Sequence, residues 1–192
     1  GIRNFLLVTL GTGIGAGLIL DGKLHTGCGM AGEVGHMVTH LGGRLCTCGR
    51  HGCWERYASA TGLIRRTEEE MEASPRSILH TVAKENGAVD GRTAFQAAER
   101  GDQVAIHLCR EYAEELGCGL VNLINLLHPE RVAIGGGVAA APESLLLQPL
   151  REIVTRESYA RHGGVIPAVV RAQMGNDAGI IGAALLDRAV RE

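Results

Sequence analysis

Three cysteines crowd into eight residues of this chain, and no other feature limits its fold so strongly. Cys46, Cys48 and Cys53 follow the spacing C-x-C-x4-C, with Gly49 and Gly52 between the thiols. Glycine lets the backbone curl tightly enough for three sulfurs to converge on one ion at about 2.3 Å. Unliganded thiols are the alternative, but a loop rarely gathers three of them, so the spacing predicts a metal site.

A structural zinc site takes four ligands, and the neighbouring sequence offers three histidines as the fourth. They are His36, His40 and His51. His51 lies inside the cysteine knuckle, from where it reaches back awkwardly. His36 follows a glycine and comes ten positions before the first cysteine, so it has room to fold back. Spacing favours His36 and leaves the other two open.

Composition limits the class of protein and its partners. The chain has 192 residues, which suits one core or two small lobes, and 45% of them are hydrophobic. A net charge of -2 argues against DNA or an anionic membrane as partner, and 3% aromatic residues argue against a base-stacking surface. We find no apolar run of membrane-span length and no secretion-signal pattern, so thiols this clustered favour a reducing, cytoplasmic setting.

The order of predicted elements indicates an α/β domain. We expect strands at 4–10, 16–20 and 23–26, a short one at 37–40, and two more at 131–134 and 168–171. We expect a helix at 57–73 and a new helix start at Ser74-Pro75. Further helices are expected at 93–100, from a cap at Asp102 to 127, from Pro142 to about 160, and at 178–190. Three strands, a helical stretch and then strand–helix–strand–helix make up the order.

Two glycine-rich segments are candidate ligand loops. Gly11-Thr12-Gly13 lies between two predicted strands, has no following lysine and opens no helix, so it is neither a P-loop nor a dinucleotide fingerprint. Its backbone N–H groups and the Thr12 hydroxyl suit a phosphate, although a plain glycine-rich hairpin is an equal alternative. Gly135-Gly136-Gly137 follows a strand, where ligands sit in open α/β sheets, and would let a flat adenine approach the backbone. The alternative there is a simple strand-to-helix turn.

Several segments together resemble the ROK family of sugar kinases and related repressors. They are LGTGIGAGLILDGKL at 10–24, GMAGEVGHM at 29–37 and LCTCGRHGCWE at 45–55, followed by YASATGL. The pairing of E-x-G-H with C-x-C-G-x-x-G-C-x-E is highly specific, and the resemblance covers nearly the whole chain. Within the family, the pattern is most similar to that of the glucokinases.

The resemblance implies an actin/hexokinase-like (ribonuclease H-like) ATPase lobe with a zinc-bound loop insert at about 27–55. It implies transfer of phosphate from Mg-ATP to the 6-hydroxyl of a hexose, glucose before others, with a sugar-sensing repressor as the alternative. Zinc would be held by His36, Cys46, Cys48 and Cys53, sugar hydroxyls by Glu33, His36 and Glu55, and ATP by Gly11, Thr12, Gly13, Gly135, Gly136 and Gly137. A solvated loop residue is the alternative for each glutamate. If His36 binds zinc through one ring nitrogen, the other can donate to the sugar.

The resemblance also implies parts that this chain lacks. A kinase of this kind needs an aspartate that accepts the proton of the sugar 6-hydroxyl, and an Asp-x-Gly phosphate loop. Asp21, Asp90, Asp102 and Asp177 fall in turns or at helix starts. We therefore expect residues 1–192 to form a C-terminal lobe that is inactive alone, with helix 178–190 packing on the missing lobe. Relatives are commonly homodimers, and the kinase interpretation involves no nucleic acid.

Overall fold

The structure is a computed structural model that describes residues 1–175. The expected helix at 178–190 lies outside these residues. The strands are β1 (Phe5–Leu10), β2 (Ile14–Leu20), β3 (Lys23–Leu24), β4 (Arg131–Gly135) and β5 (Ala168–Arg171). The α-helices are α1 (Glu55–Ala58), α2 (Ala60–Ala73), α3 (Leu79–Asn86), α4 (Thr93–Glu99), α5 (Gln103–Leu127) and α6 (Leu147–Glu157). Three 3₁₀ helices among these residues are η1 (Val34–His36), η2 (Gly137–Ala140) and η3 (Tyr159–His162).

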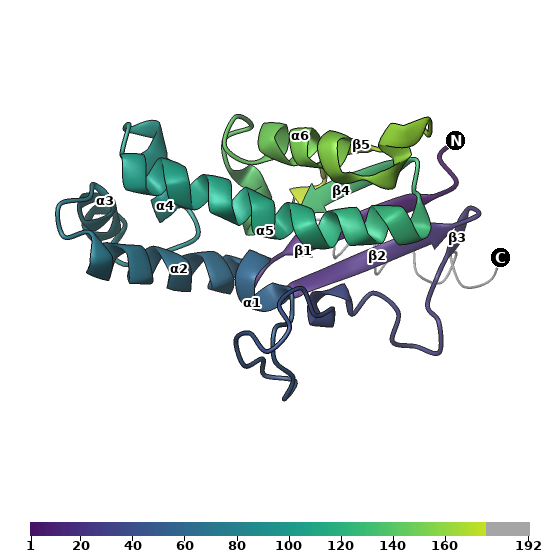
Figure 1. The fold of residues 1–192 in the computed structure, drawn as a ribbon, viewed down its shortest axis with the longest axis horizontal. Coiled ribbons are helices and arrows are strands. Elements are labelled where there is room, and N and C mark those ends of the chain that lie inside the picture. Colours follow the sequence, from purple (N-terminus) through teal and green to yellow (C-terminus); the bar gives the residue numbers. More distant parts are fainter. Residues whose placement is uncertain (176–192) are drawn as a thin grey trace.

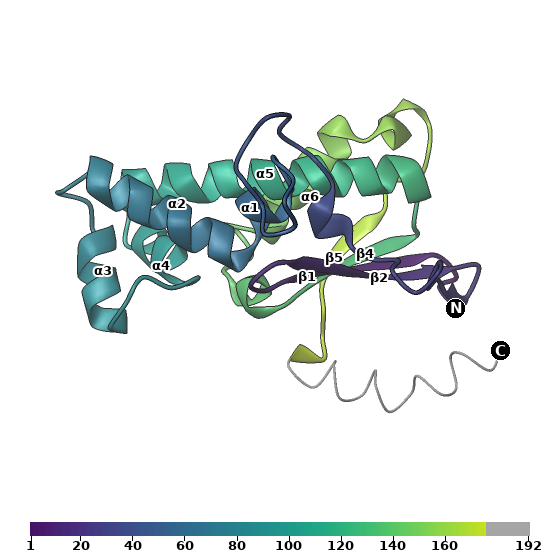
Figure 2. The ribbon, with the colours of Figure 1, turned by 90° about the horizontal axis from the view of Figure 1, so that it is seen from below.

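The five strands form one mixed sheet in the order β3-β2-β1-β4-β5. β1, β2 and β3 form an antiparallel meander, whereas β4 and β5 run parallel to β1. Helices cover one face of the sheet (Figure 2). Alternate residues of β1, namely Leu6, Val8 and Leu10, are fully buried, as expected for a strand with one covered face. The predicted α/β class is confirmed.

Helix α5 is the central support of the helical layer (Figure 1). It begins where predicted, because the Asp102 carboxylate accepts a hydrogen bond of 3.0 Å from the Ala105 N–H. Its predicted apolar stripe, including Leu116, Leu120 and Ile124, is buried in the core. Within the described residues, no helix is long and apolar enough to cross a membrane.

The helix expected at 57–73 is divided in two. Ser59 has an extended backbone (φ −82°, ψ 170°), and its side chain caps α2 by accepting a hydrogen bond from the Gly62 N–H. The break occurs because the Ala60 N–H donates to the carbonyl of Gly11 at 2.9 Å, a contact from a distant strand turn. Tertiary contact has overridden helix periodicity here.

Three other local predictions were wrong. Residues 37–40 form no strand, only an isolated bridge between Val38 and Cys53. The restart at Ser74-Pro75 fails because Asp102 binds the Ser77 hydroxyl and the Ile78 N–H, which places the start of α3 at Leu79. The helix expected from Pro142 begins instead at Leu147, after η2 and an irregular turn.

Both glycine loops lie at one edge of the sheet. Because β1 and β4 are parallel, their carboxyl ends meet, and Thr9 pairs with Gly135. Gly136 follows with φ +85°, and a Cβ there would lie 2.2 Å from the carbonyl oxygen of Leu10. Only glycine permits this approach, so the second loop is pressed against the base of the first.

Candidate functional site

His36 and the three cysteines come together in space. One ligand atom from each side chain lies within 4.8 Å of the others. The sulfurs of Cys48 and Cys53 are 3.6 Å apart, and Cys46 Sγ is 3.7 Å from His36 Nδ1. Neighbouring ligand atoms of a tetrahedral zinc site with 2.3 Å Zn–S bonds are separated by about 3.8 Å. The cluster therefore has the number, type and spacing of groups that a structural zinc ion needs.

The other two histidines face elsewhere. The ring of His51 is hydrogen-bonded inside the loop, and that of His40 lies 3.3 Å from the carboxylate of Glu115. His36 presents Nδ1 to the cysteines, while its Nε2 lies 3.9 Å from Glu33. One ring nitrogen is directed at the metal cluster, which leaves the other for a second partner.

Two glycines shape the knuckle. Gly49 and Gly52 have φ values of +86° and +81°. A Cβ on Gly52 would lie only 1.6 Å from the carbonyl oxygen of His40, and the Gly52 carbonyl accepts the N–H groups of Thr39 and His40. The curl expected from the glycines is present, and at Gly52 close backbone packing requires glycine as well.

The thiols differ in their affinity for protons. Burial, helped by Cys48 and Cys46, raises the pKa of Cys53 to about 12. At Cys48 a backbone hydrogen bond from Arg50 lowers the thiol pKa despite some desolvation. Metal ions bind thiolates, so metal binding here must displace at least the Cys53 proton.

Trp54 anchors the cysteine loop to α5. Its side chain is fully buried, and Nε1 donates to the carbonyl of Glu115 at 2.9 Å. The indole packs so closely on α5 that a Cβ on Gly119 would lie 2.2 Å from it. Since Trp54 stands between Cys53 and Glu55, this anchor fixes a candidate metal ligand and a candidate sugar ligand together.

The two candidate sugar-binding glutamates flank His36 but differ in exposure. Glu55, at the start of α1, is 15% exposed, and its Oε1 lies 3.9 Å from His36 Nδ1 and 3.2 Å from Cys46 Sγ. Glu33, just before η1, is 63% exposed and faces the other ring nitrogen. The carboxylates of Glu33 and Glu55 thus lie near the two different nitrogens of the His36 ring.

The glycine turn at 11–13 touches this cluster. A Cβ on Gly13 would lie 2.4 Å from Glu55 Oε2, so glycine is what admits the carboxylate. The start of α2 holds the turn through the bond from Ala60 to Gly11 and a second one, 2.8 Å, from the Thr61 hydroxyl to the Thr12 carbonyl. Because the carbonyls of Gly11 and Thr12 are bonded to α2, they do not face an anion bound at the turn.

Sequence reasoning missed the residues that join these parts. Trp54 and Thr61 carry no motif of their own, although both lie within or beside the quoted segments LCTCGRHGCWE and YASATGL. Within residues 1–175, none of the three aspartates reaches the site. Asp21 sits in the β2–β3 turn, Asp90 pairs with Arg92, and Asp102 caps α5.

Comparison with known proteins identifies the family of this chain. A sequence profile of the ROK family matches residues 1–190. A glucokinase of Halalkalibacterium halodurans is 41% identical over 185 residues, which cover 95% of this chain and 55% of that protein. A crystal structure of a Streptomyces griseus ROK family glucokinase with glucose and AMPPNP superimposes with a TM-score of 0.84 at 38% identity, over 97% of this chain and 61% of that one.

A regulator matches as well. The crystal structure of a transcriptional regulator of the same family, a homologue of the E. coli MLC protein, has a TM-score of 0.83 at 29% identity. The superposition covers 98% of this chain and 46% of the regulator. The chain therefore spans about half to three fifths of the length of these relatives.

Proposed function

The chain belongs to the ROK family, and from this premise we propose that it forms the sugar- and nucleotide-binding lobe of an ATP-dependent hexose kinase. The observation that carries the proposal is the contact of Glu55 with both His36 and Gly13. It places a group suited to sugar hydroxyls directly beside a turn suited to phosphate. Phosphoryl transfer depends on bringing these two substrates together.

We propose that Glu33, His36 and Glu55 bind the hydroxyls of the sugar, with glucose as the hexose. Carboxylates accept hydrogen bonds from neighbouring hydroxyls, and the free nitrogen of a metal-bound histidine can donate one. Zinc on His36, Cys46, Cys48 and Cys53 would fix the ring between the two carboxylates. The ion would serve structure rather than phosphoryl chemistry.

The nucleotide would occupy the edge of the sheet where β1 and β4 end. Gly11, Thr12 and Gly13 would face the phosphates of Mg-ATP, and Gly135, Gly136 and Gly137 the adenosine. Support comes from the direct packing of Gly136 on Leu10, which makes the two loops one continuous surface. Ligands of open α/β sheets bind at this position.

Catalysis needs a base for the 6-hydroxyl, and we propose that a second lobe supplies it as an aspartate. The test compares two proteins. One is the 192-residue chain, and the other is this chain fused to the part of the Halalkalibacterium halodurans glucokinase that it does not match. We expect glucose-dependent ADP formation from the fusion and none from the chain alone. An inactive but folded, zinc-loaded fusion contradicts the kinase proposal, and turnover by the chain alone contradicts the missing base.

A sugar-sensing repressor is the second candidate, favoured by the similarity to the MLC homologue. The two candidates differ in their need for nucleotide. A kinase lobe should bind a non-hydrolysable ATP analogue, and substitution of Gly136 by alanine should abolish this binding because the new methyl meets the Leu10 carbonyl. Sugar binding without any nucleotide binding would favour the repressor. For either candidate we propose a cytoplasmic homodimer.

A further inference from the structure

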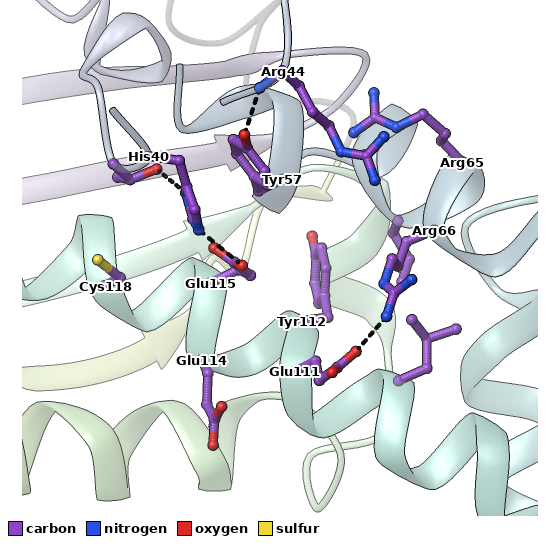
Figure 3. Close-up of a pocket in the computed structure, with 14 residues that line it drawn as sticks. His40, Arg44, Tyr57, Arg65, Arg66, Glu111, Tyr112, Glu114, Glu115 and Cys118 are labelled. Atoms are coloured by element: carbon purple, nitrogen blue, oxygen red, sulfur yellow. Dashed lines mark hydrogen bonds and ion pairs between the residues drawn. The ribbon is translucent and has the colours of Figure 1, made fainter. Parts of the chain in front are cut away.

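A pocket lies beside the cysteine loop and away from the Glu55–Gly13 contact. Its volume is about 480 Å³, and it lies between residues 39–44 of the loop, helices α1 and α2, and helix α5 (Figure 3). Neither the four candidate metal ligands nor the two glycine loops line it. A molecule bound here would not occupy the proposed sugar and nucleotide sites.

One side of this pocket carries three guanidinium groups, from Arg44, Arg65 and Arg66 (Figure 3). All three approach a single carboxylate, Glu69, at 2.8, 3.9 and 3.5 Å. Arg66 is also paired with Glu70 and Glu111. Among the described residues, Arg44 and Arg65 therefore share one carboxylate between them, while Glu111, Glu114 and Glu115 line the pocket together with the three arginines.

Arg65 is only partly satisfied, since its Nη2 donates to the carbonyl of Arg56 while its Nε is buried and has no hydrogen-bond acceptor within the described residues. Burial, followed by repulsion from Arg44 and Arg56, lowers the guanidinium pKa despite the presence of Glu69. A buried donor without an acceptor costs free energy, and an anion would remove that cost.

The opposite side offers the chemistry of a hydroxyl-binding site. His40 stacks on Tyr57 with ring centroids 4.0 Å apart, and its Nε2 lies 3.3 Å from Glu115 (Figure 3). His40 Nδ1 is bonded to the Thr39 hydroxyl at 3.1 Å, so both nitrogens of this ring are engaged and the carboxylate of Glu115 is the group that can accept from a ligand hydroxyl. Tyr112 and Leu63 also line the pocket but are almost fully buried, so they offer a ligand little surface.

We propose that this pocket is a small-molecule site that binds a sugar phosphate, with the phosphate at Arg44 and Arg65 and the hydroxyls at Glu115. Planar guanidinium groups suit phosphate oxygens, and the volume exceeds that of a hexose monophosphate. The choice of a sugar phosphate rests on the proposed kinase function, since that compound would be its product. The cavity and its charges do not depend on that function.

Calorimetric titration of the 192-residue chain tests the proposal, with glucose 6-phosphate, glucose and inorganic phosphate as separate probes. Arg65→Met keeps the apolar stem and should weaken glucose 6-phosphate binding at least about tenfold while leaving glucose binding unchanged. Glu55→Gln should instead weaken glucose binding and leave glucose 6-phosphate binding unchanged. Arg44→Gln provides a second pocket variant should Arg65→Met not fold. Inorganic phosphate should bind more weakly than glucose 6-phosphate and with the same dependence on Arg65.

A second measurement needs no variant. Cys118 lines the pocket, so glucose 6-phosphate should slow its alkylation by at least about threefold, measured by peptide mapping, while glucose should not. The proposal is overturned by failure of glucose 6-phosphate to bind, by binding that Glu55→Gln rather than Arg65→Met abolishes, or by unprotected Cys118. Failure of the glucose titration alone contradicts the proposed function and not this pocket.

Discussion

Substitution of Gly119 by alanine tests the anchor between the cysteine loop and α5. The new Cβ would lie 2.2, 2.4 and 2.5 Å from three atoms of the Trp54 indole, whereas ordinary contact begins at 3.4 Å. The ring must therefore move by about 1 Å, and it is fully buried and bonded to the Glu115 carbonyl. Its neighbours Cys53 and Glu55 would move with it.

The expected change in stability follows from three contributions. Overpacking costs about 1–3 kcal/mol and the lost indole hydrogen bond about 1 kcal/mol, while alanine improves helix propensity by about 1 kcal/mol. The net loss is about 1–3 kcal/mol, which lowers Tm by roughly 2–12 °C for a chain of this length. Glucose affinity of the active fusion should fall as well, because Glu55 is displaced.

Gly117 provides the matched control, since it also lies in the middle of α5. A Cβ there meets Ile153 Cγ2 at 2.7 Å, a milder overlap than that at Gly119 and one with an aliphatic side chain instead of the indole. We expect Gly117→Ala to stay within about 1 kcal/mol of the unmodified chain. Circular dichroism melts give the stability, and fluorescence of the single tryptophan reports on the anchor itself. Equal melting of both variants, with unchanged emission, would refute the proposed anchor.

Two further substitutions test the support of the site and the fold. Thr61→Val removes the hydroxyl bonded to Thr12, so it should weaken binding of an ATP analogue roughly 2–10-fold without altering glucose binding, and Thr61→Ser should restore it. Equal effects on both ligands would point to general unfolding instead. Asp102→Ala should cost about 1–2 kcal/mol at neutral pH by removing the cap of α5. Burial opposes ionisation of Asp102, but hydrogen bonds from Ala105, Ser77 and Ile78 outweigh it and hold the pKa below its usual range. Because its folded pKa is depressed, ionised Asp102 stabilises the fold fully above the unfolded pKa of about 3.9, and this stabilisation is lost as the pH falls through the folded pKa. Urea melts should therefore show the stabilities of the two proteins converging in acid. A difference independent of pH would contradict this account.

Features that depend on neighbouring residues could be predicted from the sequence. The strand expected at 168–171 and the cap at Asp102 occur at the predicted residues, because local hydrophobic pattern and capping chemistry decide them. The spacing of the cysteines likewise identified the cluster, since three ligands lie within one short loop. His36 was favoured by spacing and is the histidine that the structure places beside them.

Features that depend on distant residues could not. The break at Ser59 results from a hydrogen bond to Gly11, and the start of α3 results from Asp102, so neither shows in the local pattern. Trp54 becomes an anchor only through Gly119, a partner on another helix. The pocket beside the cysteine loop is formed by residues 39–44, α1, α2 and α5, whose charges come together only on folding, and nothing in the linear sequence marks it.

The central claim is that zinc on the cysteine cluster holds the sugar-binding residues in place. The most direct measurement is the glucose KM of the active fusion carrying Cys48→Ser, together with its zinc content. We predict less than one zinc per chain and a glucose KM raised at least about tenfold, with the ATP KM changed much less. Loss of zinc with an unchanged glucose KM would contradict the claim.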